Sequence, residues 1–252
     1  MTTRQILFCQ EQPGLICDAA DFDGANDYMT RGDDLGGVVN SPDGIISFWV
    51  RKDGGDGSIQ AVLVNDTTGS KVSIVLGTFG RVQIDLGDLF PSSSLSIETE
   101  DNGLLAGTGW HHVLASWRVN QAISHLYLDD VSDRIVSTSG DTTVGYLDAT
   151  NWGIGAYTNA SNKLNGCLAE LYFAPGQYLD FSIPANRRKF ITSTGKPAHL
   201  GSDGSLPTGT APTVYQHLAN AEAVANFAVN RGTGGNFTIT GTLDTASSSP
   251  SD

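Results

Sequence analysis

The feature that most constrains the fold of this chain is residues 110–130, whose alternating pattern predicts a β-hairpin. Every second residue from Val113 to Val119 is apolar, and the positions between them are mixed. A period of two indicates a strand with two unlike faces. A short loop, 120–122, leads into a second alternating run that ends at Asp129. Two such strands cannot bury their apolar face alone, so they require a surrounding sheet and a second sheet that covers it.

The rest of the chain repeats this pattern at intervals of roughly ten residues, which is typical of β-sandwiches and jelly rolls. Glycine makes up 30 of the 252 residues, and long helix-forming residues are few, which favours short strands and tight turns. We predict two short strand pieces within 20–29, and further strands at 45–51, 59–64, 72–76, 81–86, 134–137, 151–157, 164–173, 213–218 and 237–240. Residues 90–109 are predicted to be mostly loop, 183–191 a helix with Pro184 in its first turn, and 220–229 a weak helix.

The predicted fold is therefore all-β: a two-sheet antiparallel jelly-roll sandwich with a short helix and an irregular C-terminal extension. We divide the chain into residues 1–194, the jelly roll with an N-terminal strand or arm, and residues 195–252. The second part is rich in Gly, Thr and Ser and poor in charge. We expect this extension to pack on the domain or on neighbouring molecules.

The net charge restricts the classes of partner that the protein can bind, and the cysteine content indicates where it is made. The net charge of −13 disfavours nucleic acid and anionic lipid, and no run of residues is apolar enough for a membrane span. The first residues lack the apolar core of a secretion signal. An odd number of cysteines without such a signal indicates reduced thiols in a protein made in a cytoplasm, although a Cys9–Cys17 bridge stays open.

Six short segments occur in an order and spacing that resemble laminin-G-like domains of the concanavalin A-like lectin/glucanase superfamily. They are FDGANDYM (22–29), ISFWVR (46–51), WHHVLASW (110–117), LYLDD (126–130), IGAY (154–157) and LNGCLAELYF (164–173). The resemblance covers about residues 20–190 and implies a jelly roll of two curved sheets. It places Glu170 at an acidic position of the family, where we expect it to orient neighbouring loops. The C-terminal stretches GKPAHLGSDGS and NRGTGGNFTITG resemble the ends of phage and prophage virion proteins that carry this domain.

Acidic residues concentrate near the N-terminal end of the predicted jelly roll. Asp21, Asp23 and Asp27 could supply the oxygen ligands that Ca²⁺ prefers, and many relatives in the resembled family hold calcium at a sheet edge. The alternative is that these residues cap turns, since their spacing is not that of an EF-hand and no Glu closes the site. Calcium is the only cofactor that the sequence suggests.

The sequence gives little support to an enzymatic function. Glu98 and Glu100 alternate as a retaining glycosidase pair would, but the superfamily's acidic motif is not matched and their flanks read as loop. His111 and His112 are adjacent on a strand and so point to opposite faces, which prevents joint binding of one metal. No Ser-His-Asp arrangement, phosphate loop or Cys-X-X-Cys is present. We therefore expect a protein that is not an enzyme.

One basic cluster, Arg187, Arg188 and Lys189, is either a solvated helix face or an interface for an acidic neighbour such as another copy's Asp-rich loops. The sequence favours a non-enzymatic phage virion structural protein, a capsid decoration or a tail-fibre component. It would assemble with copies of itself and other virion proteins, with host-surface carbohydrate as a further ligand. The alternatives are a glycan-binding module outside a virion and a glycan hydrolase.

Overall fold

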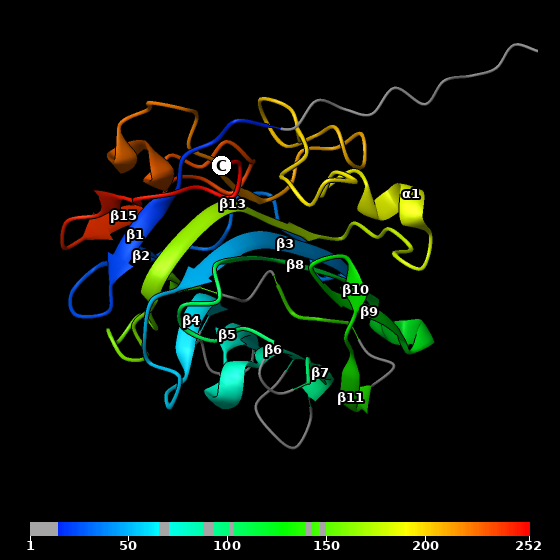
Figure 1. The fold of residues 1–252 in the computed structure, drawn as a ribbon. Coiled ribbons are helices and arrows are strands. Elements are labelled where there is room, and N and C mark those ends of the chain that lie inside the picture. Colours follow the sequence, from blue (N-terminus) through cyan, green and yellow to red (C-terminus); the bar gives the residue numbers. More distant parts are fainter. Residues whose placement is uncertain (1–14, 66–70, 88–92, 101–102, 140–142, 147–149) are drawn as a thin grey trace, which may run out of the picture.

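Two antiparallel sheets of 8 strands each pack face to face in the computed structural model, which describes residues 15–65, 71–87, 93–100, 103–139, 143–146 and 150–252 (Figure 1). The first sheet has the order β10-β9-β8-β3-β13-β1-β16, and β14 also pairs with β13. Its strands are β1 (Ala20–Asp23), β3 (Asp43–Lys52), β8 (Trp110–Arg118), β9 (Ile123–Leu128), β10 (Val131–Ser132), β13 (Asn165–Pro175), β14 (Val214–Gln216) and β16 (Asp244–Thr245).

The second sheet has the order β11-β7-β6-β5-β4-β12-β2-β15. Its strands are β2 (Tyr28–Arg31), β4 (Gln60–Asn65), β5 (Lys71–Leu76), β6 (Val82–Gly87), β7 (Ser93–Glu98), β11 (Ile135–Ser139), β12 (Trp152–Ile154) and β15 (Thr238–Thr240). Both sheets therefore combine strands from distant parts of the chain. The all-β, two-sheet jelly-roll prediction is confirmed.

Most predicted strands are present, and the hairpin at 110–130 forms with Val113 opposite Leu128 and Arg118 opposite Ile123. Three expectations were wrong. Residues 93–98 form β7 within a segment predicted to be loop. The helix predicted over 183–191 is only the four-residue α1, Pro184–Arg187. Within 220–229 the structure has a 3₁₀ segment, Val224–Ala228.

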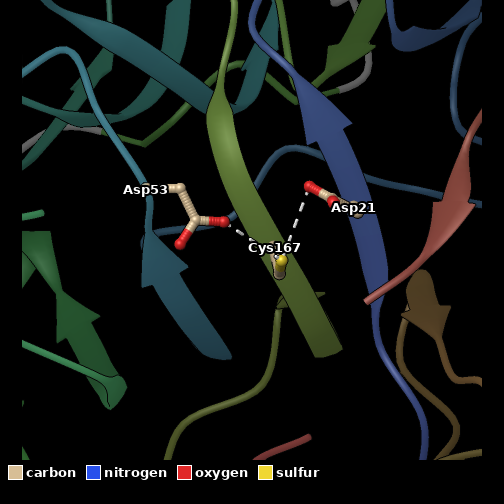
Figure 2. A group of neighbouring side chains, drawn as sticks. All are labelled: Asp21, Asp53 and Cys167. Atoms are coloured by element: carbon tan, nitrogen blue, oxygen red, sulfur yellow. Dashed lines mark hydrogen bonds between the residues drawn. The ribbon is translucent and has the colours of Figure 1, made fainter. Parts of the chain in front are cut away.

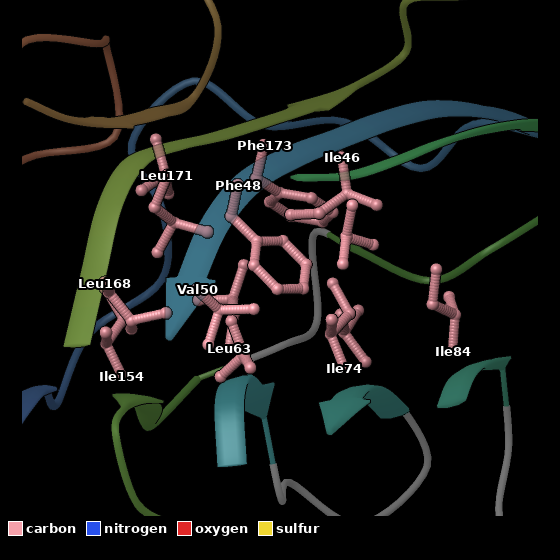
Figure 3. Close-up of a cluster of buried hydrophobic side chains, with 14 of the residues drawn as sticks. Ile46, Phe48, Val50, Leu63, Ile74, Ile84, Ile154, Leu168, Leu171 and Phe173 are labelled. Carbon is pink, nitrogen blue, oxygen red and sulfur yellow. The ribbon is translucent and has the colours of Figure 1, made fainter. Parts of the chain in front are cut away.

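The apolar core lies between the sheets, where side chains from both inner faces interdigitate (Figure 3). Trp117 is fully buried there and its indole nitrogen donates a hydrogen bond to the Tyr146 hydroxyl at 2.8 Å. The ring lies flat against Gly44, where a Cβ atom would come within 2.3 Å of it. Gly44 in β3 thus leaves the space that the Trp117 ring in β8 fills, because any side chain at position 44 would overlap with the ring.

The first sheet is also covered on its outer face, by the chain that follows β13 (Figure 1). A second apolar cluster forms there between the strands and residues of 179–215, including Phe181, Phe190 and Tyr215. The C-terminal extension adds β14 and β16 to the first sheet and β15 to the second. Among the described residues, no helix has the length and apolarity needed to cross a membrane.

The core predicts a large effect of Trp117→Ala. The substitution removes a fully buried ring and leaves the buried Tyr146 hydroxyl without this donor, so we expect a loss of about 3–5 kcal/mol in the free energy of unfolding. Denaturant titration measures it, with Trp110→Ala as the control because Trp110 is only half-buried. A loss below about 1 kcal/mol would contradict the assigned place of Trp117 in the core.

Candidate functional site

The outer face of the first sheet carries a polar cluster formed by Arg51, Asp53, Asp21 and Cys167. Figure 2 shows the last three of these side chains. Arg51 lies opposite Cys167, and Cys167 opposite Asp21, so the cluster crosses β3, β13 and β1. One ligand atom from each of Asp21, Asp53 and Cys167 lies within 4.8 Å of the others. Burial raises the pKa of the Cys167 thiol, and burial also raises the pKa of Asp21.

Arg51 already occupies this cluster as its cation. Its guanidinium donates to both carboxylate oxygens of Asp53, at 2.9 and 3.0 Å, and to the sulfur of Cys167 at 3.1 Å. A metal ion would have to compete with that guanidinium and deprotonate a thiol whose pKa is raised. The geometry describes a hydrogen-bond network around a guanidinium better than a metal site.

The residues predicted to bind calcium do not come together as one group in the described structure. Asp23 caps the turn after β1, where its Oδ1 accepts from the backbone N–H groups of Ala25, Asn26 and Asp27 at 2.7, 2.9 and 3.2 Å. These donors lower the pKa of Asp23. Asp27 Oδ1 accepts from the Thr242 N–H at 2.8 Å. Asp21 lies in the Arg51 cluster. Calcium binding stays a prediction from sequence, and among the three residues only Asp23 makes the turn-capping contacts of the alternative.

A groove of about 410 Å³ opens at one end of the sandwich, where three loops meet. The loops are the β1–β2 turn, the β3–β4 loop and the β12–β13 loop. The lining consists of glycines and polar side chains, with two apolar residues and one basic residue: Gly24, Gly55, Ser58, Ile59, Gln60, Ala160, Ser161, Asn162, Lys163 and Asn165. Such a surface offers many hydrogen-bonding groups and little net charge.

The buried amide of Gln60 holds the walls of this groove together. Gln60 donates to the Gly54 carbonyl at 2.7 Å and accepts from the Asn165 N–H at 3.2 Å, which ties the β3–β4 loop to β13. A Cβ at Gly24 would come within 2.7 Å of the Asn165 side chain, and one at Gly55 within 2.0 Å of the Gln60 amide. Glycine is therefore required at both positions, and both have positive φ.

The β12–β13 loop presents the exposed amide of Asn162 to the groove. Asn159 Oδ1 accepts from the N–H and the hydroxyl of Ser161 at 3.0 and 2.6 Å, and Lys163 donates to the Ala160 carbonyl at 2.5 Å. These bonds fix the loop without using Asn162, whose backbone is left-handed with φ 52°. Its side chain has no hydrogen bond to another described residue, so it is available to a ligand.

The carboxylates considered for hydrolysis are not arranged as a catalytic pair. Glu98, in β7, accepts from Arg81 at 3.3 Å and from Gln83 at 3.1 Å, which neutralises it. Glu100 follows the strand end, and its N–H donates to Asp133. His111 bonds to Asp129 and Thr108, whereas His112 is buried and bonds to Ser47. The two histidines thus lie in different environments, as expected for adjacent residues of a strand, whose side chains point to opposite faces.

The basic cluster is paired within the chain. Arg187 and Arg188 donate to the two carboxylate oxygens of Asp130, at 2.5 and 2.6 Å, and the Lys189 ammonium donates to the Pro207 carbonyl at 2.7 Å. Arg187 also stacks on Tyr127, 4.6 Å from its ring centre. An interface at these three residues stays a prediction, but the charges of Arg187 and Arg188 already dock the segment after β13 onto the β9–β10 turn.

Glu170 is buried in β13 and contacts the C-terminal extension. Its carboxylate accepts from the Tyr215 hydroxyl at 2.8 Å and pairs with His217 Nδ1. The backbone of Glu170 has φ 51°, unusual for a strand residue, and lies within a β-bulge between Ala169 and Tyr172. Cys17 is a buried free thiol, and Cys9 lies outside the described residues, so their pairing is not tested.

Comparison with known proteins yields no matching family model and no matching curated protein. Among solved structures, the chain resembles a Bacteroides ovatus protein proposed to bind carbohydrate (TM-score 0.60, 12% identity), covering 93% of this chain and 60% of that one. It also resembles the heptameric SAP-like pentraxin of Limulus polyphemus (TM-score 0.51, 8% identity; 91% and 94% covered). A third match is domains LG4-5 of mouse laminin α1 (TM-score 0.47, 18% identity; 66% and 43% covered). These neighbours share the concanavalin A-like jelly roll, and this chain has that fold.

The burial of His112 on the outer face of the first sheet predicts how the stability of the protein depends on pH. Its ring stacks on Trp49 at 4.7 Å, and burial lowers its pKa from 6.5 to about 4. In the unfolded chain His112 is protonated below about pH 6.5, whereas in the folded chain it is protonated only below about pH 4. Between these pH values the unfolded state binds the extra proton, so the folded state loses stability as the pH falls through this window. We expect His112→Phe to reduce the acid-induced loss in the free energy of unfolding by up to about 3 kcal/mol, because the variant has no imidazole to protonate at this position.

Denaturant titrations at several pH values measure this dependence. His199→Phe is the control, since His199 is exposed whereas His112 is buried. An identical pH profile for wild type and His112→Phe would show that His112 titrates normally in the folded protein.

Proposed function

We propose that this chain is a non-catalytic glycan-binding domain whose ligand site is the groove between the β1–β2, β3–β4 and β12–β13 loops. The observation that carries the proposal is the lining: backbone glycines, hydroxyls and amides around one open groove, on a rigid jelly roll. Sugar hydroxyls need hydrogen-bond partners of this kind, and Asn162 offers an amide that can donate and accept. The fold likeness to a Bacteroides ovatus protein proposed to bind carbohydrate supports the same class of ligand.

The charge of the chain supports uncharged glycans over anionic ones. The net charge is −13, and the groove contains one basic side chain, Lys163, whose ammonium already donates to the Ala160 carbonyl. Sulfated or sialylated sugars would meet a repulsive field from the protein as a whole. Binding that depends on hydroxyl hydrogen bonds is also expected to vary little with ionic strength, because salt screens only charged interactions.

A pair of asparagine variants tests the groove. Asn162→Gly removes the exposed amide while keeping a residue that tolerates φ 52°, and its backbone carbonyl can still accept from the Ala61 N–H. Asn151→Gly is the matched control, because Asn151 is also exposed with φ 60° but lies outside the groove. On a glycan array, we expect wild type and Asn151→Gly to bind neutral glycans, and Asn162→Gly to lose about tenfold in affinity.

Two results would count against the proposal. Equal binding by all three proteins would place the glycan site elsewhere on the chain. Binding restricted to sulfated or sialylated glycans would contradict the charge argument.

We also propose, from the resemblance of the C-terminal stretches to phage and prophage proteins, that the domain serves on a virion, as a decoration or tail-fibre component present in several copies. The alternative is the same glycan-binding module outside a virion. A hydrolase is less well supported, because Glu98 is ion-paired with Arg81.

Particle association separates these alternatives. We expect mass spectrometry of purified phage particles to detect the chain, and sedimentation of the isolated protein to show association at high concentration. A protein that is monomeric at all concentrations and does not bind particles would leave the free glycan-binding module as the better assignment.

A further inference from the structure

Phe79 is an exposed aromatic residue on a strained backbone. It lies in the turn between β5 and β6, its side chain is 64% exposed, and its backbone is left-handed (φ 62°, ψ 24°). Bulky residues rarely adopt this conformation, and Asn, Asp or Gly usually occupy it. Among the described non-glycine residues with positive φ, Phe79 is the only aromatic one. Neither solvent exposure nor local conformation therefore accounts for phenylalanine at this position.

The turn that carries Phe79 is held firmly. The Phe79 N–H donates to the Asp56 carbonyl at 3.2 Å, and the Gly80 carbonyl accepts from the Leu104 N–H at 3.0 Å. Asp56 is itself anchored, because its carboxylate pairs with the buried ammonium of Lys52 at 3.0 Å and accepts from the Ala106 N–H at 3.0 Å. The ring is thus displayed to solvent from a fixed backbone, which lowers the entropy cost of binding a ligand against it.

The same contact places Phe79 beside the groove. Asp56 belongs to the β3–β4 loop, and Ser58 and Ile59, which follow it in this loop after Gly57, line the groove. Two Cα–Cα steps span at most about 7 Å, so a ligand that leaves the groove over Ser58 reaches the Phe79 turn directly. Ile59 is a second apolar side chain on this route, 40% exposed. Two exposed apolar residues, Phe79 and Ile59, thus belong to segments at this side of the polar groove.

We propose that Phe79 and Ile59 form an apolar extension of the groove that binds the C–H-bearing face of a second sugar ring, so that the ligand is a neutral oligosaccharide. This inference rests on the proposed function. Pyranose rings have one face of C–H groups, which gains from burial against an aromatic ring as other apolar surface does. Two side chains expose far less than the roughly 800 Å² per partner of a stable protein interface, which disfavours a protein partner.

The test compares ligand length in variants that relieve the strain. Phe79→Asn removes the ring and suits the left-handed backbone, so we expect its melting temperature to equal or exceed that of wild type. Val131→Asn is the matched control, because Val131 is 66% exposed on β10 and lies outside the groove. The probes are cello-, malto- and chitohexaose and the corresponding monosaccharides, titrated calorimetrically into the full chain together with Phe79→Tyr and Asn162→Gly.

We expect Phe79→Asn to lose about tenfold or more in hexasaccharide affinity while monosaccharide binding stays unchanged. Phe79→Tyr and Val131→Asn should bind as wild type does, and Asn162→Gly should weaken both probes. Loss of binding in Asn162→Gly with unchanged hexasaccharide binding in Phe79→Asn would overturn the inference and leave the proposed function standing. Absence of binding to every probe would overturn both. If Phe79→Asn instead abolishes self-association in sedimentation, the residue is a contact between copies and the inference is wrong.

Discussion

The β-bulge at Glu170 is the constraint on which the rest of the architecture depends. Before the bulge, Leu168 faces the inter-sheet core and Ala169 faces outward; after it, Leu171 and Phe173 face the core and Tyr172 faces outward. One extra residue resets the alternation, so that β13 presents apolar side chains to both faces along its length. It also divides the neighbours of β13: β1 pairs with 165–168 and β14 with 171–173. A strand without the bulge would turn Leu171 and Phe173 away from the core.

The bulge also explains how a polar C-terminal extension becomes part of the domain. Glu170 is only 2% exposed and would be costly to bury alone, but Tyr215 and His217 approach it from the extension. Removing one member of such a buried pair typically costs about 3–5 kcal/mol, because the other is left uncompensated. Further along, Arg51 and Trp110 donate to Ser248, and the Ser251 hydroxyl donates to the Cys17 carbonyl. A segment poor in apolar residues is thus fixed through hydrogen bonds to the first sheet.

The sequence predicts the strands in which apolar and polar residues alternate. It misses the features that arise only when strands and loops distant in the sequence are brought together. The hairpin at 110–130 was predictable because every second residue of its first strand is apolar from Val113 to Val119. β7 was not, because serines at alternate positions mask the inward-facing Leu95 and Ile97. The segment 183–191 has a helix-like composition, yet Phe190 and Ile191 are drawn into separate outer-face clusters, which ends the helix at Arg187. The groove was invisible in the sequence, since it depends on strand register bringing Asn165 against Gly24 and Gly54, although the glycines mark each loop separately.

Acidic residues in this chain are a sign of turns more than of cation sites. Asp23 caps the β1–β2 turn, Asp180 accepts from Ser182 before α1, and Asp203 does the same for Ser205. Asp129 accepts from the His112 N–H and anchors the β9–β10 turn. Each carboxylate replaces a hydrogen bond that the backbone of a tight turn cannot make for itself. Turn-capping aspartates of this kind contribute to the net charge of −13, whereas the lining of the groove contains no acidic residue. The electrostatic field of this net charge repels anionic ligands without contacting them, which supports the proposed preference of the groove for neutral glycans.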